Sequence, residues 1–228
     1  MKKLLISLSL LSLMSSVYAT DTTSAKSGIV FQGQVSANFT PDQTLDGVNN
    51  NSHFISSPET YNGGLGGALF VGYDYAINSN MTVGGKVGYQ YVYTVNEYQA
   101  SSVFGNDPDI KLNMNNIPVL ATFKYIFNSG WLLGAEGGID IQKWTLKRDG
   151  NNGYINEYMD YSTSYSSNWN IAPMIGLSGG YQFSFGLAVT GNVDYVFGKS
   201  TDDITSVSEN DALAYYSIGL NVSYTLPI

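Results

Sequence analysis

The final residues of the chain alternate between apolar and polar side chains up to the last one. Only a β-strand places alternate residues on opposite faces, so this segment predicts a strand. One face would carry small and polar residues: Gly219, Asn221, Ser223 and Thr225. The other would be wholly apolar: Ile218, Leu220, Val222, Tyr224, Leu226 and Ile228. Such a strand suits a barrel wall with lipid outside and polar groups inside.

The same alternation recurs along the chain in about eight segments. Each is long enough to cross a bilayer as a tilted strand of roughly 9–11 residues. The segments are 28–39, 68–77, 81–95, 116–127, 131–144, 168–185, 187–197 and 212–228. We therefore predict an all-β fold, an eight-stranded antiparallel up-and-down transmembrane β-barrel.

The connections between these segments alternate between short and long. The short ones lie at 78–80, at 128–130 and around Gly186, and the long ones span 40–67, 96–115, 145–167 and 198–211. Outer-membrane barrels have short periplasmic turns and long extracellular loops. This rhythm predicts that both ends of the mature chain are periplasmic and that four loops face outward.

Aromatic residues fall at two heights on the predicted wall, as the two membrane interfaces require. The periplasmic girdle would contain Tyr73, Tyr75, Tyr125, Phe127, Trp131, Tyr181, Phe183, Phe185 and Tyr224. The outer girdle would contain Phe39, Tyr91, Tyr93, Trp144, Trp169, Tyr195, Phe197 and Tyr216. A soluble β-sandwich has no membrane interfaces, so it would not be expected to concentrate aromatic residues in two belts.

The first 19 residues read as a secretory signal peptide. Lys2 and Lys3 precede an apolar run, 4–13, that is too short to span a bilayer as a helix, and Ala19 ends a small-residue cleavage site. Residues 20–228 would then form one barrel domain. No later run is long and apolar enough to predict a membrane helix.

Composition narrows the class of protein further. Only 12% of the residues are charged, whereas about a quarter is typical of soluble domains, and Tyr (18) and Gly (25) are frequent. The formal net charge of −8 argues against nucleic acid as a partner. The absence of Cys removes disulfides, thiol catalysis and thiolate metal sites. We expect no cofactor and no metal.

The strand pattern, the loop rhythm and the last strand, 220–228, resemble the OmpA/OmpX-like superfamily of small outer-membrane β-barrels. The resemblance covers nearly the whole mature chain and implies a monomer without a peptidoglycan-binding domain. It also implies that the barrel-assembly machinery recognises the last strand, here through Tyr224, Leu226 and Ile228. The terminal Ile departs from the aromatic residue usual in that family.

Six charged residues fall on the inward faces of the predicted strands. They are Asp74, Lys86, Lys124, Glu136, Asp140 and Asp194. Lys86, Lys124 and Glu136 lie at similar heights on consecutive strands, so we expect them to meet as a buried ion-pair cluster. An eight-stranded barrel is just wide enough for side chains to fill. This cluster therefore predicts a polar plug, with a narrow ion or solute path as the alternative.

Most of the remaining cations lie near the predicted outer ends of strands. They are Lys111, Lys143, Lys147, Arg148 and Lys199. Lipopolysaccharide phosphates lie at that height, and Lys and Arg bind phosphate strongly. We predict headgroup contacts, with ordinary snorkelling at the interface as the alternative.

The long loops are the candidate binding surface. Segment 145–167 carries Tyr154, Tyr158, Tyr161 and Tyr165 among Asn, Ser and Asp, a mixture that binding loops use. Lipid-modifying enzymes of the outer membrane generally use a catalytic His, and the only His here, His53, lies in another loop. A lipid-modifying enzyme is therefore the third hypothesis for the function. The sequence thus predicts an outer-membrane barrel that acts in envelope integrity and in adhesion or protection through a host or surface ligand. It predicts no enzyme.

Overall fold

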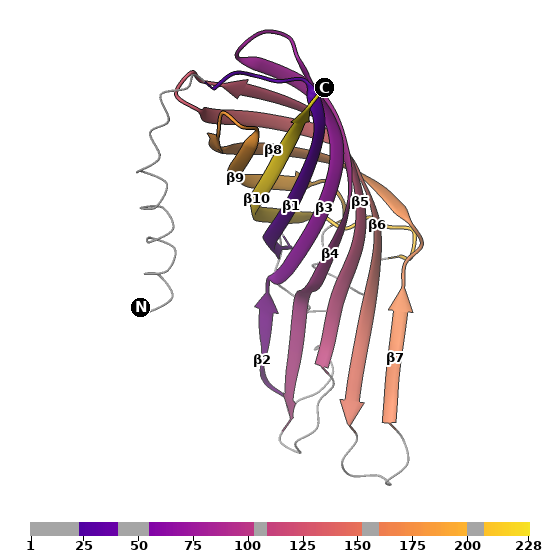
Figure 1. The fold of residues 1–228 in the computed structure, drawn as a ribbon. Coiled ribbons are helices and arrows are strands. Elements are labelled where there is room, and N and C mark those ends of the chain that lie inside the picture. Colours follow the sequence, from indigo (N-terminus) through magenta and orange to yellow (C-terminus); the bar gives the residue numbers. More distant parts are fainter. Residues whose placement is uncertain (1–22, 41–54, 103–108, 152–159, 200–207) are drawn as a thin grey trace, which may run out of the picture.

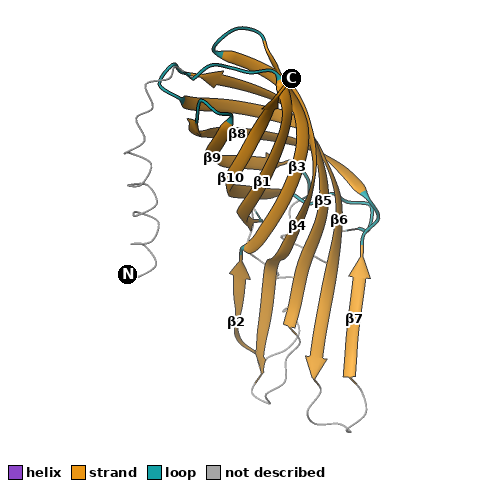
Figure 2. Cartoon of the chain, viewed as in Figure 1, coloured by secondary structure: helices purple, strands orange, loops and turns teal. Residues whose placement is uncertain are grey.

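The computed structural model describes residues 23–40, 55–102, 109–151, 160–199 and 208–228. These residues form strands joined by turns and short connections (Figure 2). The strands are β1 (Gly28–Phe39), β2 (Ile55–Asn62), β3 (Gly64–Ala76), β4 (Met81–Ser102), β5 (Asp109–Ile126), β6 (Trp131–Asn151), β7 (Asp160–Ser166), β8 (Asn170–Gln182), β9 (Leu187–Val196) and β10 (Tyr215–Pro227). No helix among the described residues is long and apolar enough to cross a membrane.

Eight of the strands close into a barrel. The ring runs β1, β3, β4, β5, β6, β8, β9, β10 and back to β1, and every pair in it is antiparallel. The closing seam joins β1 to β10 from Gly28 opposite Pro227 to Phe39 opposite Tyr216. The predicted eight-stranded antiparallel barrel is confirmed.

Three of the predicted long loops contain strands in their described parts, which corrects the sequence-based boundaries. β4, β5 and β6 continue beyond their predicted ends, β2 pairs with the outer part of β4, and β7 pairs with the outer part of β6. This five-stranded sheet, here called the extension, projects from one end of the barrel (Figure 1). Segments 55–62, 96–102 and 160–166 are polar at most positions, so apolar–polar alternation does not mark them as strands. Segment 109–115 does alternate, with Ile110, Leu112 and Met114 as its apolar positions, but the predicted strand began only at Asn116.

The opposite end of the barrel carries the short hairpin turns, as the sequence predicts. They connect β3 to β4, β5 to β6 and β8 to β9. Gly130 and Gly186 occupy two of these turns with φ of +88° and +100°, a backbone conformation that side chains with a Cβ disfavour. Ile77 N–H donates to the Met81 carbonyl at 2.9 Å and closes the third turn. This end is called the turn end below.

The outer wall of the barrel is apolar and exposed. Leu69, Val71, Ile175, Leu177 and Leu220 are all more than 45% exposed, which a soluble protein would avoid over so continuous a surface. Aromatic rings sit together at the turn end, where Tyr181 contacts both Trp131 and Phe183 edge to edge. This wall is suited to lipid.

One residue assigned to the outer aromatic girdle lies elsewhere. Trp144 is only 3% exposed and points into the barrel. The alternation of β6 continues without a break from Leu132 to Trp144, so all even-numbered positions there face inward. The predicted outward position of Trp144 was wrong, and its ring fills the outer part of the lumen.

Candidate functional site

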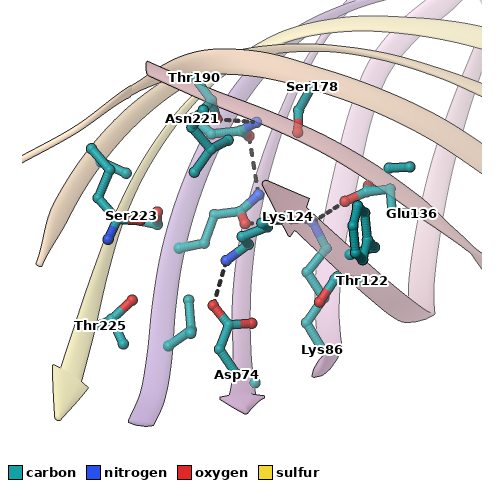
Figure 3. A pocket seen from close by; sticks show the side chains of 18 of the residues that line it. Asp74, Lys86, Thr122, Lys124, Glu136, Ser178, Thr190, Asn221, Ser223 and Thr225 are labelled. Atoms are coloured by element: carbon teal, nitrogen blue, oxygen red, sulfur yellow. Dashed lines mark hydrogen bonds and ion pairs between the residues drawn. The ribbon is translucent and has the colours of Figure 1, made fainter. Parts of the chain in front are cut away.

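The turn-end half of the lumen holds two ion pairs (Figure 3). Lys86 of β4 lies 2.7 Å from Glu136 of β6, and Lys124 of β5 lies 2.6 Å from Asp74 of β3. These side chains are largely buried, and the Lys86 ammonium also lies 4.6 Å from the centre of the Phe70 ring. The four charges compensate one another pairwise across the ring, as buried charges must.

A small cavity adjoins these pairs. Its volume is about 40 Å³, and its lining includes Asp74, Lys86, Lys124, Glu136 and Thr190. A site that holds one water needs at least about 10–15 Å³, so this space suits a few waters and not a continuous pore. Around it the lumen is filled by side chains.

Asp194 is one of the two remaining inward carboxylates, and it lies beside the Lys86–Glu136 pair. Asp194 and Glu136 both lie over Gly176, where a Cβ would approach Asp194 Cγ within 3.2 Å and Glu136 Cγ within 3.0 Å. Asn192 donates its amide to Asp194 Oδ2. The structure therefore groups Asp194 with Lys86 and Glu136, while Lys124 and Asp74 form a separate pair.

Asp140 sits further toward the extension in a network of neutral groups. The Tyr215 hydroxyl donates to Asp140 Oδ2 at 2.9 Å and accepts from the Asn116 amide at 2.8 Å. Tyr215, Asn116 and Asp140 are fully buried. Neither Tyr215 nor Asn116 was predicted as a site residue, although the strand alternation places both inward.

The outer end of the lumen is apolar, which corrects the expectation of a wholly polar interior. The cluster, here called the apolar cap, consists of Val92, Leu112, Met114, Leu120, Trp144, Ala172, Met174, Val196, Leu213 and Tyr215. The segment before β10 folds into it: the Gln142 amide brackets the Leu213 backbone with bonds of 3.0 and 2.9 Å. The Trp144 indole donates to the Asp211 carbonyl at 3.0 Å.

The turn end is covered by residues 23–27, here called the strap. Ala25 N–H donates to the Ser79 carbonyl at 2.7 Å, and the Lys26 ammonium donates to the Ser184 carbonyl at 2.6 Å. Ser79 lies in the β3–β4 turn and Ser184 in the β8–β9 turn, on opposite sides of the ring. Thr23 is buried. The strap therefore crosses the turn-end mouth of the barrel.

The predicted basic residues lie in two places. Lys111, Lys143 and Lys147 lie together on the β5–β6 ladder, with Lys111 opposite Lys147. Arg148 lies next along β6, and its side chain is outside the described residues. Lys199, past the end of β9, lies 3.0 Å from Asp211. Lys111, Lys143 and Lys147 thus gather on the β5–β6 part of the wall, and Lys199 lies apart from them.

The loop and assembly candidates are placed only in part. Tyr154, Tyr158 and His53 lie outside the described residues. Tyr161 and Tyr165 lie on β7, where Tyr165 is 48% exposed and its ring centre lies 5.7 Å from that of Trp144. Tyr224, Leu226 and Ile228 project from the wall at the turn end of β10.

No protein-family model and no curated protein sequence matches the chain. The crystal structure of the neisserial surface protein NspA aligns with a TM-score of 0.54 at 12% identity, over 89% of this chain and 99% of that one. The chain has the fold of small outer-membrane β-barrels. The outer-membrane protein OprG of Pseudomonas aeruginosa aligns with a TM-score of 0.46 at 12% identity, over 90% and 100% of the two chains. Ail of Yersinia pestis gives 0.42 at 13%, over 89% and 100%.

Proposed function

We propose that the protein is a closed outer-membrane barrel whose working part is the extension, held at the cell surface for adhesion or protection. The observation that carries this proposal is the continuation of β4, β5 and β6 beyond the barrel, with β2 and β7 added at the sides. Function on surface proteins commonly lies in elements that a rigid scaffold presents. The barrel is such a scaffold, and its apolar wall anchors it and contributes to envelope integrity.

The edges of the extension are suited to a protein partner. In the described part of the chain β2 pairs with β4 alone, and β7 pairs with β6 alone. Each therefore presents one row of backbone N–H and C=O groups. An extended segment of a partner can add to such an edge.

The same arrangement supports a proposed orientation. We propose that the extension faces outward, that both termini are periplasmic and that the chain inserts as a monomer. The barrel-assembly machinery would recognise Tyr224, Leu226 and Ile228 in the last strand. Protease added to intact cells should then cleave the extension and leave the strap untouched.

A narrow channel is the second candidate, because the ion-paired chamber beside Lys86 and Lys124 is polar and hollow. The apolar cap opposes it, since tightly packed apolar side chains fill the lumen there and an ion would have to pass between them. Single-channel recording on the refolded protein separates the two. A closed barrel gives no openings, whereas discrete openings would favour transport.

A trimmed variant tests the proposed role of the extension. Short Asn-Gly turns replace residues 98–110 and 148–163, which leaves Glu97 opposite Lys111 and Lys147 opposite Ser164. Bacteria that display the full protein should attach to host cells or resist serum, and bacteria with the trimmed barrel should not. Heat-modifiable migration of the trimmed barrel shows that it folds. Unchanged attachment and resistance after removal of residues 98–110 and 148–163 would overturn the proposal.

A further inference from the structure

We propose that the outward face of β5 and β6, just outside the apolar belt, binds a phosphate-bearing lipid headgroup of the outer leaflet. The site is the lysine patch, formed by Lys111, Lys143 and Lys147. This inference rests on the proposed membrane orientation. It concerns a different part of the molecule from the extension edges, on which the proposed function depends.

The strand register puts all three lysines on one face. Lys111 lies opposite Lys147, and Lys143 lies opposite Asn115. The positions along each strand differ by even numbers, so their side chains project to the same side of the sheet. Lys147 is exposed and the other two are partly exposed.

The patch begins where the lipid-facing surface ends. The row next to Lys143, toward the turn end, pairs Ile117 with Ile141, and the row after it pairs Val119 with Ile139. Tyr89, on the neighbouring strand, is 52% exposed and donates its hydroxyl to Asn115 at 2.6 Å. A tyrosine of this kind is typical of a membrane interface.

The charges of the patch call for an anion. Lys147 lies opposite Lys111 of β5, and Lys111 in turn lies opposite Glu97 of β4. Lys111 takes part in an interaction within the protein. Within the described part of the chain, Lys143 and Lys147 have no carboxylate partner, so these two carry the predicted phosphate contacts.

The surroundings select an amphiphile over a water-soluble anion. Lysine binds phosphate as a point charge, and the isoleucine rows below it offer an apolar surface for acyl chains. A lipid with a phosphate headgroup satisfies both parts at once. A free anion would use only the lysines.

Lipid association can be measured with a spin-labelled phosphatidic acid in dioleoylphosphatidylcholine vesicles that contain the refolded full chain. Spin-labelled phosphatidylcholine is the neutral reference. We expect the wild type to prefer phosphatidic acid. K143Q/K147Q should lower the association constant for phosphatidic acid at the patch roughly 30-fold, because the attraction of both lysines to the anionic headgroup is lost. The arginine pair K143R/K147R should retain the preference.

Lys199→Gln is the matched control, because Lys199 is a cation near the outer rim that is already paired with Asp211. It should leave the lipid preference unchanged. An equal loss in this variant, or no preference in the wild type, would overturn the site. Competition by inorganic phosphate at the same affinity as the lipid would overturn the acyl-chain part and with it the lipid assignment. Failure of the wild type to insert would instead count against the membrane proposal.

Discussion

Lys86 and Glu136 form an ion pair of 2.7 Å between β4 and β6, two strands that are not neighbours because β5 lies between them. The contact therefore crosses the lumen and not a strand ladder. Glu136 shares its surroundings with Asp194 over Gly176, so Lys86 serves two carboxylates. This asymmetry predicts different consequences for the two partners.

Lys86→Met should destabilise the barrel more than Glu136→Gln. Without Lys86, two carboxylates stay buried with no nearby cation, and loss of one member of a buried pair costs about 3–5 kcal/mol. Without Glu136, Lys86 keeps Asp194 as a neighbour, so the loss should be smaller. Urea unfolding in vesicles measures both. Equal losses would show that Asp194 does not compensate Lys86.

Trp144→Ala should open the outer end of the lumen. Removing a buried indole from the apolar cap should cost about 3–5 kcal/mol and leave a cavity there. Recording in planar bilayers should then detect increased ion leakage through the refolded barrel. Trp169→Ala is the control, because Trp169 is 49% exposed on the outer wall, and it should cause little leakage. Equal leakage from both variants would show that the cap is not the seal.

Deletion of residues 23–26 should admit water-soluble reagents to the ion-paired chamber from the turn end. The chain has no Cys, so a single Ser223→Cys change places one thiol in the wall of the cavity. A small charged methanethiosulfonate should label it faster when the strap is absent. Ser129→Cys, in an exposed turn, should label at the same rate in both backgrounds. Identical rates for Ser223→Cys would mean that the strap does not cover the chamber.

The contact of Asp211 with Ser208 and Lys199 should hold the last connection at neutral pH and weaken in acid. The Ser208 backbone N–H and the Lys199 ammonium lower the pKa of Asp211 below its usual value of about 3.9. Because the folded pKa is lowered, the stabilisation is present above the usual pKa and is lost as the pH falls through the folded one. The Ser208 amide signal in NMR should therefore shift in that acid range. In Asp211→Asn the transition should be absent, and its persistence there would assign it to another group.

Strand alternation was enough to predict the ring, because the wall between lipid and lumen imposes apolar and polar faces on each strand. It failed where that contrast is absent. Segments 55–62 and 160–166 form strands in the extension, yet most of their residues are polar. The apolar cap was missed for the opposite reason: Met114 and Val196 face inward but are as apolar as wall residues.

The candidate site could be predicted only as a set of residues. Alternation placed Lys86, Lys124 and Glu136 inside, but their pairing depends on the stagger between strands, which a single sequence does not specify. Tyr215 was read as part of an alternating strand and not as the centre of a buried network. The strap has no periodic signal, since its contacts are to turn backbones.

The seam between Gly28 and Pro227 has a consequence for biogenesis. Gly28 and Pro227 are separated by almost the whole length of the chain. One edge of β1 therefore stays unpaired until β10 is available. Long-range closures of this kind are slow and leave the intermediate prone to aggregation. Loss of residues 224–228 would shorten the pairing of β10 with both of its neighbours, β1 and β9.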